Sequence, residues 1–205
     1  MTDWRARAAV PLCDDRVLLR PVTPADRDGL RAIALDPRIW RWFVTRVDTE
    51  TDFRALFDGM LTDSATGRRI VFAVVDRRSG RLAGSTSYGN LSEPDRRLEI
   101  GWSWLGVEFQ GSGINPHVKG LLLDHAFTSL GAERVEFKTD QRNVQARRAL
   151  RSIGAVEEGI LRSYNPMPDG RRRDAVFYSV VRQEWPEVKA RLTDRAAAAA
   201  LVGGR

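Results

Sequence analysis

The first quarter of the chain shows apolar runs separated by helix-start signals. Residues 16–20 form a short apolar run between two arginines, which predicts a strand. Thr23, Pro24 and Asp26 follow, and a capping hydroxyl, a proline suited to the first helical position and an acidic first turn predict a helix. Pro37 should end this helix, because the residue before a proline disfavours helical geometry.

A second helix is predicted after Thr49, where apolar residues recur at helical spacing: Phe53, Leu56, Phe57 and Met60. Between the two helices, Trp40, Trp42 and Phe43 lie among arginines, and we interpret them chiefly as core residues. Three strands separated by short turns come next, at 68–76, 82–90 and 98–105. This series predicts an antiparallel meander.

The second half of the chain alternates between helix and strand patterns. Helices are expected at 116–130 and 143–153, and strands at 134–139, 155–161 and 175–181. Because a helix connects 98–105 with 134–139, these two strands should be parallel. The prediction is an α/β (α+β mixed-sheet) fold, with a mostly antiparallel sheet and helices on both faces.

The length of 205 residues suits one domain. We expect an N-terminal extension over 1–13, the domain over 14–189 and an alanine-rich, frayed tail over 190–205. No apolar run approaches the roughly 20 residues of a membrane-spanning helix, and the N-terminus lacks a signal-peptide pattern. The lone Cys13 excludes an internal disulfide and a cysteine zinc cluster. These features predict a cytoplasmic protein with no membrane partner and no metal.

The formal net charge is +6 and comes mostly from arginine. Solubility, a phosphate-rich small molecule or nucleic acid would each explain such an excess. Helix-turn-helix patterns, zinc-finger spacing and basic stretches interleaved with aromatics are missing from the sequence, so we do not expect a nucleic-acid partner.

The most informative segment lies between a predicted strand and a predicted helix, at 107–116. Gly111 and Gly113 allow the backbone amides to approach a ligand closely. Asn115 can cap the following helix, and Pro116 suits its first position. Free amides and the positive end of the helix dipole make such a loop suited to a pyrophosphate, although an ordinary turn would have the same spacing.

The motif Gln110-x-x-Gly113-x-Asn115 resembles the Gln/Arg-x-x-Gly-x-Gly/Ala signature of the GNAT acetyltransferases. The order of elements agrees over roughly residues 14–188, and the best local match is the branch of ribosomal-protein N-terminal acetyltransferases. Supporting segments are 98–102 before the loop, Asn143 at the start of the next helix, 153–155 at its end, 158–162 after it, and 174–185.

This resemblance implies acetyl-CoA as co-substrate, bound where strands 98–105 and 134–139 splay apart. The pantetheine arm would pair with the backbone of Leu105 and Val107. Asn143 would hydrogen-bond the arm, and Arg147 or Arg148 could reach phosphate or adenine, unless each simply lies on a solvated helix face. The pyrophosphate would bind the amides of Gln110, Gly111, Ser112, Gly113, Ile114 and Asn115.

The chain departs from the family pattern at three places. Asn115 replaces a small residue, and Pro116 removes one amide donor from the helix start. Ala146 and Leu150 stand where family members carry a serine or a tyrosine hydroxyl, which is thought to protonate the departing thiolate. The resemblance therefore leaves the identity of the general acid in question.

Candidate catalytic residues follow from the chemistry of amine acetylation. An attacking amine must lose a proton, and Glu99 is our candidate base, directly or through a water, with a salt-bridged strand carboxylate as the equal alternative. His117 is the rival base, and Tyr164 is a candidate acid. The acceptor side would be lined by Trp40, Phe43, Ser85 and Trp102.

The sequence thus predicts an acetyl-CoA-dependent N-acetyltransferase that acts by direct attack in a ternary complex. The acceptor is a primary amine, and it stays open between a small molecule and a protein N-terminus. The alternative is a non-catalytic acyl-CoA-binding sensor of the same fold. A homodimer would be compatible with the family.

Overall fold

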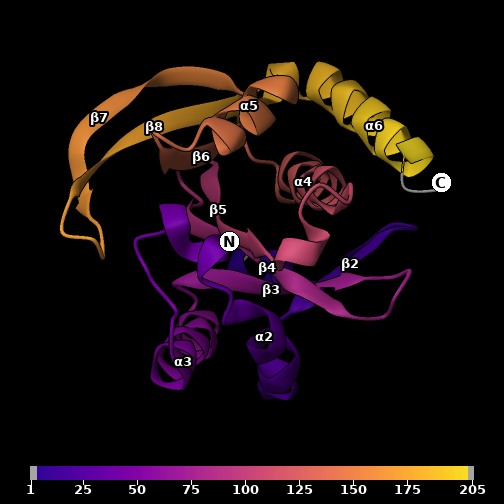
Figure 1. The fold of residues 1–205 in the computed structure, drawn as a ribbon. Helices are drawn as coiled ribbons and strands as arrows, with labels where there is room; N and C mark the ends of the chain where they lie inside the picture. The colour runs from indigo at the N-terminus through magenta and orange to yellow at the C-terminus, as the bar shows by residue number, and fades with distance from the viewer. Residues whose placement is uncertain (1–3, 203–205) are drawn as a thin grey trace.

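The computed structural model describes residues 4–202 and arranges them around one eight-stranded sheet of order β1-β2-β3-β4-β5-β6-β8-β7 (Figure 1). All neighbouring strands are antiparallel except β5 and β6, which confirms the predicted mixed sheet. The strands are β1 Leu12–Cys13, β2 Val17–Pro21, β3 Arg69–Asp76, β4 Leu82–Ser92, β5 Arg97–Leu105, β6 Arg134–Asp140, β7 Val156–Pro166 and β8 Arg172–Val181.

Helices cover both faces of this sheet, with α2 and α3 on one side and α4 on the other (Figure 1). The α-helices are α1 Trp4–Ala8, α2 Arg27–Ala34, α3 Glu50–Thr66, α4 Ile114–Asp124, α5 Val144–Ser152 and α6 Trp185–Val202. Short 3-10 segments are η1 Pro24–Asp26, η2 Pro37–Trp42, η3 Val107–Phe109 and η5 Arg182–Glu184, and a π-helical segment, η4 His125–Leu130, continues α4.

The helix-start signals in the sequence work as expected. At α3, the Thr49 hydroxyl accepts from the Asp52 amide and the Asp52 carboxylate accepts from the Thr49 amide. Asp26 likewise accepts from the Thr23 amide at 2.8 Å, and this start opens η1 before α2. These reciprocal bonds satisfy amides that a helix leaves free at its N-terminus.

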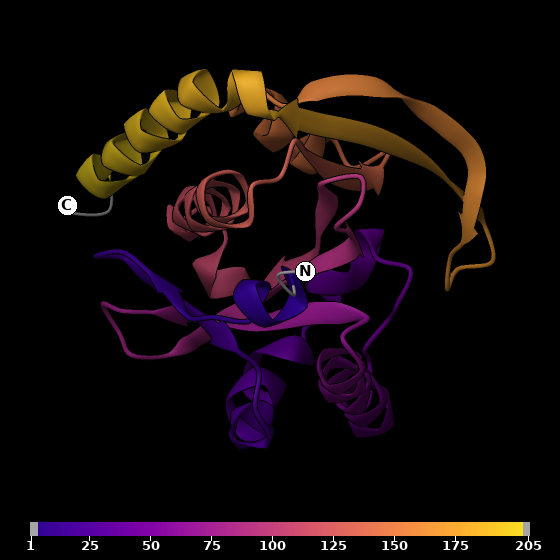
Figure 2. The ribbon, with the colours of Figure 1, turned by 180° about the vertical axis from the view of Figure 1, so that it is seen from behind.

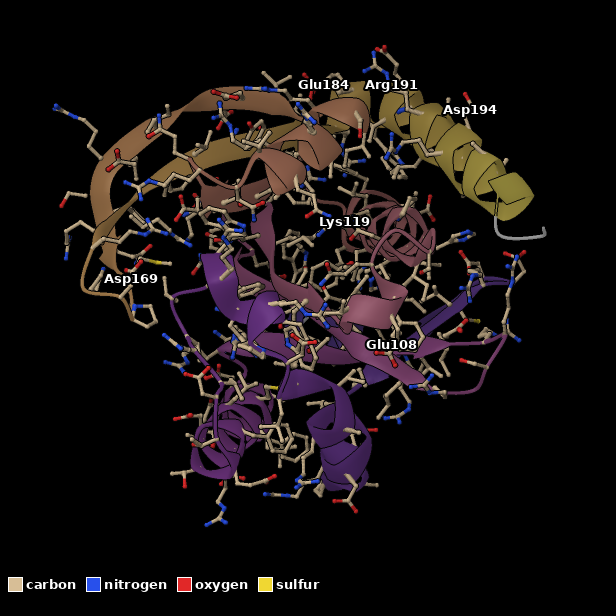
Figure 3. All side chains as sticks on the ribbon, viewed as in Figure 1. Glu108, Lys119, Asp169, Glu184, Arg191 and Asp194 are labelled. Carbon is tan, nitrogen blue, oxygen red and sulfur yellow. The ribbon has the colours of Figure 1, made fainter. Side chains whose placement is uncertain are left out.

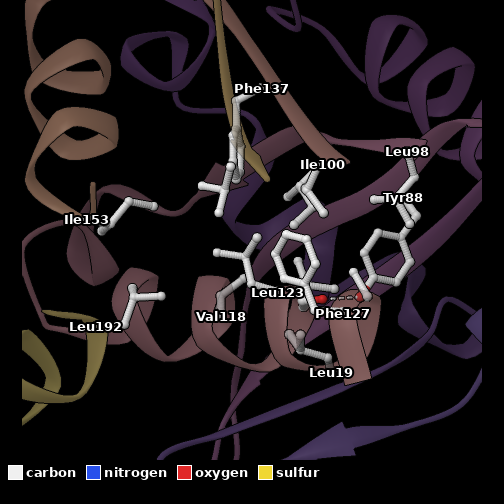
Figure 4. Packing of buried hydrophobic residues seen from close by; sticks show 14 of the residues in the cluster. Leu19, Tyr88, Leu98, Ile100, Val118, Leu123, Phe127, Phe137, Ile153 and Leu192 are labelled. Carbon is white, nitrogen blue, oxygen red and sulfur yellow. Dashed lines mark hydrogen bonds between the residues drawn. The ribbon is translucent and has the colours of Figure 1, made fainter. Parts of the chain in front are cut away.

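The larger apolar cluster lies between the sheet and α4 (Figure 4). Val118, Leu123 and Phe127 project from α4 and η4 toward the buried side chains of β4, β5 and β6. The buried Tyr88 hydroxyl donates to the Leu122 carbonyl at 2.5 Å, so the helix is tied to β4 by a polar bond as well as by packing.

Strands β5 and β6 pair only at their beginnings, where Arg97, Leu98 and Glu99 lie opposite Arg134, Val135 and Glu136. Beyond this point β5 follows β4 and β6 follows β8, so the two strands separate. Trp102 has φ 50°, and the β4–β5 register shifts between Ser85 and Ser87. Such an irregularity bends a strand, which accounts for the separation. We use the term strand opening for the region in which residues 100–105 of β5 and 137–140 of β6 no longer pair.

Helix α4 begins earlier than the sequence indicated. We expected Asn115 as the cap and Pro116 as the first helical residue, but Gly113 occupies the cap position with φ 85° and Ile114 begins the helix. The glycine conformation allows the chain to turn directly into the helix. Pro116 falls at the third helical position, where it still removes a free amide.

The last two strands are longer than predicted and form a curved hairpin that extends over one side of the molecule (Figure 1). We expected strands to end at 161 and restart at 175, with a loop between them. Instead Asn165 pairs with Arg173 and Pro166 pairs with Arg172. The side chains of β7 are mostly exposed, so no core periodicity marked this strand in the sequence.

Both ends of the chain contribute to the domain core, beyond the boundaries expected at residues 14 and 189. Trp4 and Ala8 of α1 are buried, and seen from behind α1 lies over the middle of the molecule (Figure 2). Leu192 of α6 is also buried, and α6 is helical through Val202, where we expected a frayed tail; the final residues, 203–205, lie outside the described part. Within residues 4–202, no helix is long and apolar enough to cross a membrane.

Candidate active site

The predicted phosphate cradle is a compact turn between β5 and α4. Gly111 and Gly113 adopt φ values of 75° and 85°, and a side chain at Gly111 would meet no atom within 4 Å, so this face of the loop is open. The Gln110 side chain donates to the Leu105 carbonyl at 3.1 Å and closes the turn. Free amides at the start of α4 then point along the helix axis, an arrangement that suits an anion.

The edge that could pair with an extended ligand is shorter than expected. Leu105 ends β5, as the resemblance implied, but Val107 belongs to η3. The Val107 carbonyl already accepts from the Gln110 amide at 3.2 Å. Strand-like pairing with a ligand therefore ends at Leu105, whose carbonyl already accepts from the Gln110 side chain.

The start of α5 follows β6 and lies next to the strand opening in the chain. Asn143 caps the helix, and its side-chain oxygen accepts from the Ala146 amide at 3.0 Å, which leaves the amide nitrogen as a donor. Arg147 is committed to the protein, since it donates to the Tyr178 hydroxyl, the Gln141 carbonyl and a glutamate of β7. Arg148 is exposed and makes no ion pair within residues 4–202, so it is the better phosphate candidate of the two arginines.

Glu99 occupies the last paired position before the strand opening. Because Leu98 and Ile100 point into the cluster under α4, Glu99 faces the opposite side of the sheet. Its side chain is buried, with 5% exposed. The Oε2 atom accepts from Asn90 at 2.7 Å and from Lys138 at 3.3 Å. Oε1 lies over Gly101, where an added side chain would come within 2.9 Å, so the carboxylate is both a candidate base and a salt-bridged group.

Tyr164 lies on the same side of the sheet as Glu99. Its ring packs edge-on against Phe177 at 5.4 Å, and the Lys138 ammonium lies 5.2 Å from its centre. Lys138 thus touches both predicted catalytic residues. Arg173 is buried beside them; its Nε atom has no hydrogen-bond partner among the described residues, and burial lowers its pKa.

The four residues expected on the acceptor side fall into two groups. Trp102 is 38% exposed and rests on Gly89, with Arg69 over its ring at 4.7 Å. Phe43 and Trp40 line a cavity of about 370 Å³ between η2 and the β7–β8 turn. Ser85, by contrast, is buried within the sheet between Ala73 and Trp104. Trp40 lines the cavity but is itself only 4% exposed, and its indole donates to the Ala34 carbonyl.

The same cavity is lined by three arginines, which bears on the basic charge of the chain. Arg38 pairs with Asp36 and Arg46 pairs with Asp48, while Arg41 stacks on Trp42. Two of the three charges are therefore compensated by neighbouring carboxylates.

His117 is directed away from the strand opening. Its Nδ1 atom lies 2.7 Å from the Asp14 carboxylate, which precedes β2. Both line a second cavity, of about 310 Å³, beside α6. The geometry therefore favours Glu99 over His117 as the base.

Sequence reasoning missed Lys119. It shares the buried face of α4 with Leu122 and Leu123, and its ammonium is buried near Ser103 of β5 and Phe137 of β6. The signal was present in the sequence, because positions three and four residues apart lie on one helix face and a lysine there interrupts the apolar stripe.

Comparison with known proteins agrees with this geometry. A family model described as "Acetyltransferase (GNAT) domain" matches residues 16–156. The chain is 26% identical over 175 residues to "Uncharacterized N-acetyltransferase p20" of Bacillus licheniformis, covering 85% of this chain and 97% of the relative. It is 35% identical over 106 residues to "Putative ribosomal N-acetyltransferase YdaF" of Bacillus subtilis (strain 168), covering 52% of this chain and 57% of the relative.

A solved structure of Mycobacterium smegmatis RimJ in complex with CoA-disulfide superposes with a TM-score of 0.74 at 26% identity, covering 90% of this chain and 92% of that one. The match of the family model spans more than half of the chain, from β2 to the start of β7. The chain therefore belongs to the GNAT family of N-acetyltransferases.

Proposed function

We propose that this protein transfers the acetyl group of acetyl-CoA to a primary amine by direct attack in a ternary complex. One observation carries the proposal: the strand opening has a glycine turn with free helix amides where β5 ends and a buried carboxylate, Glu99, where the opening begins. A thioester arm laid along β5 would therefore run from a phosphate cradle to a base.

The residues around the opening fit coenzyme A. The amides of Gly113, Ile114 and Asn115 would hold the pyrophosphate, since those of Gln110 and Ser112 already donate to Val107 and Phe109. Strand β5 up to Leu105 would pair with the arm, and Asn143 has a side-chain donor left over. Pro116 removes one amide, which costs about 0.5–1.5 kcal/mol if that bond is made in relatives. Arg148 is free to approach the nucleotide.

The acceptor amine must give up a proton near Glu99, whose Oε2 atom is held in place by two donors. The pKa of a backbone α-amino group is roughly 7.7–8, and that of a lysine side chain is about 10.4. An α-amino group therefore needs less help from a base, and the similarity to "Putative ribosomal N-acetyltransferase YdaF" supports a protein N-terminus as the acceptor.

The competing proposal is a protein that binds acyl-CoA without turnover. It is supported by the absence of a hydroxyl at Ala146 and Leu150, of which Leu150 is buried in the core. Binding without release of thiol in the presence of peptide and small amines would favour this alternative.

Calorimetric titration with acetyl-CoA tests the site. We expect micromolar binding by the wild type and its loss in Gly113→Trp, because the new side chain would fill the cradle. Gly170→Trp is the matched control: Gly170 has a similar left-handed φ of 81° and lies in the β7–β8 turn, so it carries the same backbone strain away from the loop between β5 and α4 (Figure 1). Absence of binding by folded wild-type protein would overturn the proposal.

A further inference from the structure

Lys119 is a buried ammonium that packing does not explain. Only 8% of the residue is exposed, and its neighbours on α4 belong to the apolar core. Figure 3 shows it beside α4 in the middle of the view, whereas Asp169, Glu184, Arg191 and Asp194 lie toward the edges. A buried charge is costly unless it is paired, and no carboxylate within residues 4–202 forms an ion pair with Lys119.

The contacts of Lys119 place its ammonium at the strand opening. It lies 3.4 Å from the Ser103 hydroxyl of β5 and 5.1 Å from the centre of the Phe137 ring of β6. Both residues lie beyond the last β5–β6 pair, at Glu99 and Glu136. Lys119 therefore reaches, from the α4 side, into the part of the sheet where the two strands have separated.

Helix α4 contributes both the proposed phosphate cradle and Lys119. The N-terminus of α4 forms the proposed phosphate cradle, and Lys119 follows one and a half turns later on its buried face. Ser103 itself hydrogen-bonds Thr86 at 2.7 Å, so the hydroxyl is already held and gives Lys119 only a weak partner.

We propose that Lys119 is a further catalytic residue, whose ammonium donates the proton that the coenzyme A sulfur takes up when the thioester breaks. This inference rests on the proposed acetyl transfer. Lys119 would take the role of general acid, because Ala146 and Leu150 have no hydroxyl at the positions where family members carry one.

Acetyl transfer forms a carbon–nitrogen bond and breaks the carbon–sulfur bond of the thioester. The amine nitrogen bonds to the acetyl carbon, and the carbon–sulfur bond breaks with its electron pair going to sulfur. The amine gives one proton to Glu99, and Lys119 gives one proton to the thiolate. Return of a proton from Glu99, directly or through water, restores both residues, so the products are the amide and the free thiol.

The proton affinities of donor and acceptor are matched. Burial lowers the pKa of Lys119 to about 8, against the opposing effect of the Glu99 carboxylate. A thiol titrates near roughly 8.5, so proton transfer between the two is close to balanced, whereas an ordinary lysine near about 10.4 would be a poor donor. The charged groups that face Lys119 across the opening are Glu99 of β5 and its partner Lys138 of β6.

Two substitutions test the role in catalysis. Lys119→Met keeps the length and removes the charge, and Lys119→Arg keeps a cation that does not release its proton. We expect both to lower kcat by about 10²-fold or more, as loss of a general acid does, with KM for acetyl-CoA changed less than about threefold. The basic limb of the wild-type pH–rate profile, near pH 8, should disappear in Lys119→Met. Lys189→Met, an exposed lysine of α6, is the control.

A binding measurement on the wild type needs no substitution and no turnover. If Lys119 meets the sulfur, coenzyme A should bind about tenfold more tightly than desulfo-CoA at about pH 8, because an ammonium–thiolate contact is charge-assisted. Equal affinities would overturn the inference, as would a folded Lys119→Met or Lys119→Arg variant that retains wild-type kcat. Failure of the wild type to bind either ligand would instead overturn the proposed function.

Discussion

At the scale of single residues, the proposed site combines groups from opposite sides of the sheet. Glu99 faces away from α4 and is held by Asn90 and Lys138, while Lys119 reaches the same opening from α4. Asn90 has φ 48°, a left-handed conformation that asparagine tolerates better than most residues, and this directs its amide to the carboxylate. The polar groups around Glu99 thus fix the orientation of its carboxylate.

Glu99→Gln should lower kcat at neutral pH by about 10²-fold, the usual contribution of a general base. Activity should recover as the pH rises, because the acceptor amine then loses its proton without assistance. Steady-state kinetics as a function of pH checks this expectation. Glu136→Gln is the control, since Glu136 is the register partner of Glu99 and pairs with Arg134 at 2.8 Å. Wild-type activity of Glu99→Gln at neutral pH would assign the carboxylate a structural role.

At the scale of elements, a charged network joins α5 to the β7–β8 hairpin. The Glu157 carboxylate accepts from Tyr178 at 2.6 Å, from Arg151 at 2.5 Å and from Arg147 at 3.3 Å. These bonds, that from Tyr178 foremost, lower the pKa of Glu157 to about 2. The network fixes the helix whose N-terminus offers Asn143, and it explains why Arg147 is unavailable to a ligand.

Glu157→Gln should destabilise the protein at pH 7 by about 1 kcal/mol, the order of a partly exposed ion-pair network. A carboxylate with a lowered pKa contributes stability above its ordinary value, here 4.5, and loses it as the pH falls toward 2. The difference between variant and wild type should therefore vanish across that window in urea denaturation. Glu187→Gln, in an exposed pair with Arg191, should change stability less.

At the scale of the whole molecule, the ends of the chain complete the core around α4. Trp4 joins the same apolar cluster as the β-strands, and the Arg7 side chain donates to the Ser129 carbonyl of η4. The short α1 thus covers η4, the continuation of α4 at the end opposite the proposed cradle. The N-terminal segment is part of the folded unit and not an appendage to it.

Trp4→Ala should reduce the free energy of unfolding by about 3–5 kcal/mol, as truncation of a large buried aromatic does. Val10→Ala in the same segment should change it by less than about 0.5 kcal/mol, because Val10 is 38% exposed. Chemical denaturation followed by far-ultraviolet circular dichroism, which does not rely on the tryptophan signal, measures both free energies of unfolding. Similar stabilities of the two variants would show that α1 does not contribute to the core.

The sequence by itself determined the elements with strong local signals. Thr49 and Asp52 mark a helix start through bonds that close within four residues, and the α4 crossover requires a parallel pair of strands. Local chemistry also identified the turn at Gly111 and Gly113. These features depend on residues close together in the chain, so the sequence alone predicts them.

Only the tertiary structure decided which distant side chains meet. The separation of β5 from β6 follows from the irregularity near Trp102 and from two different strand partners, and it brings Lys119 to a position that helical periodicity alone would assign to the core. The length of β7 was likewise hidden, because its register is fixed by backbone bonds to β8 and not by an apolar pattern. Contacts between residues far apart in sequence depend on strand pairs such as β6 with β8, which no local pattern encodes.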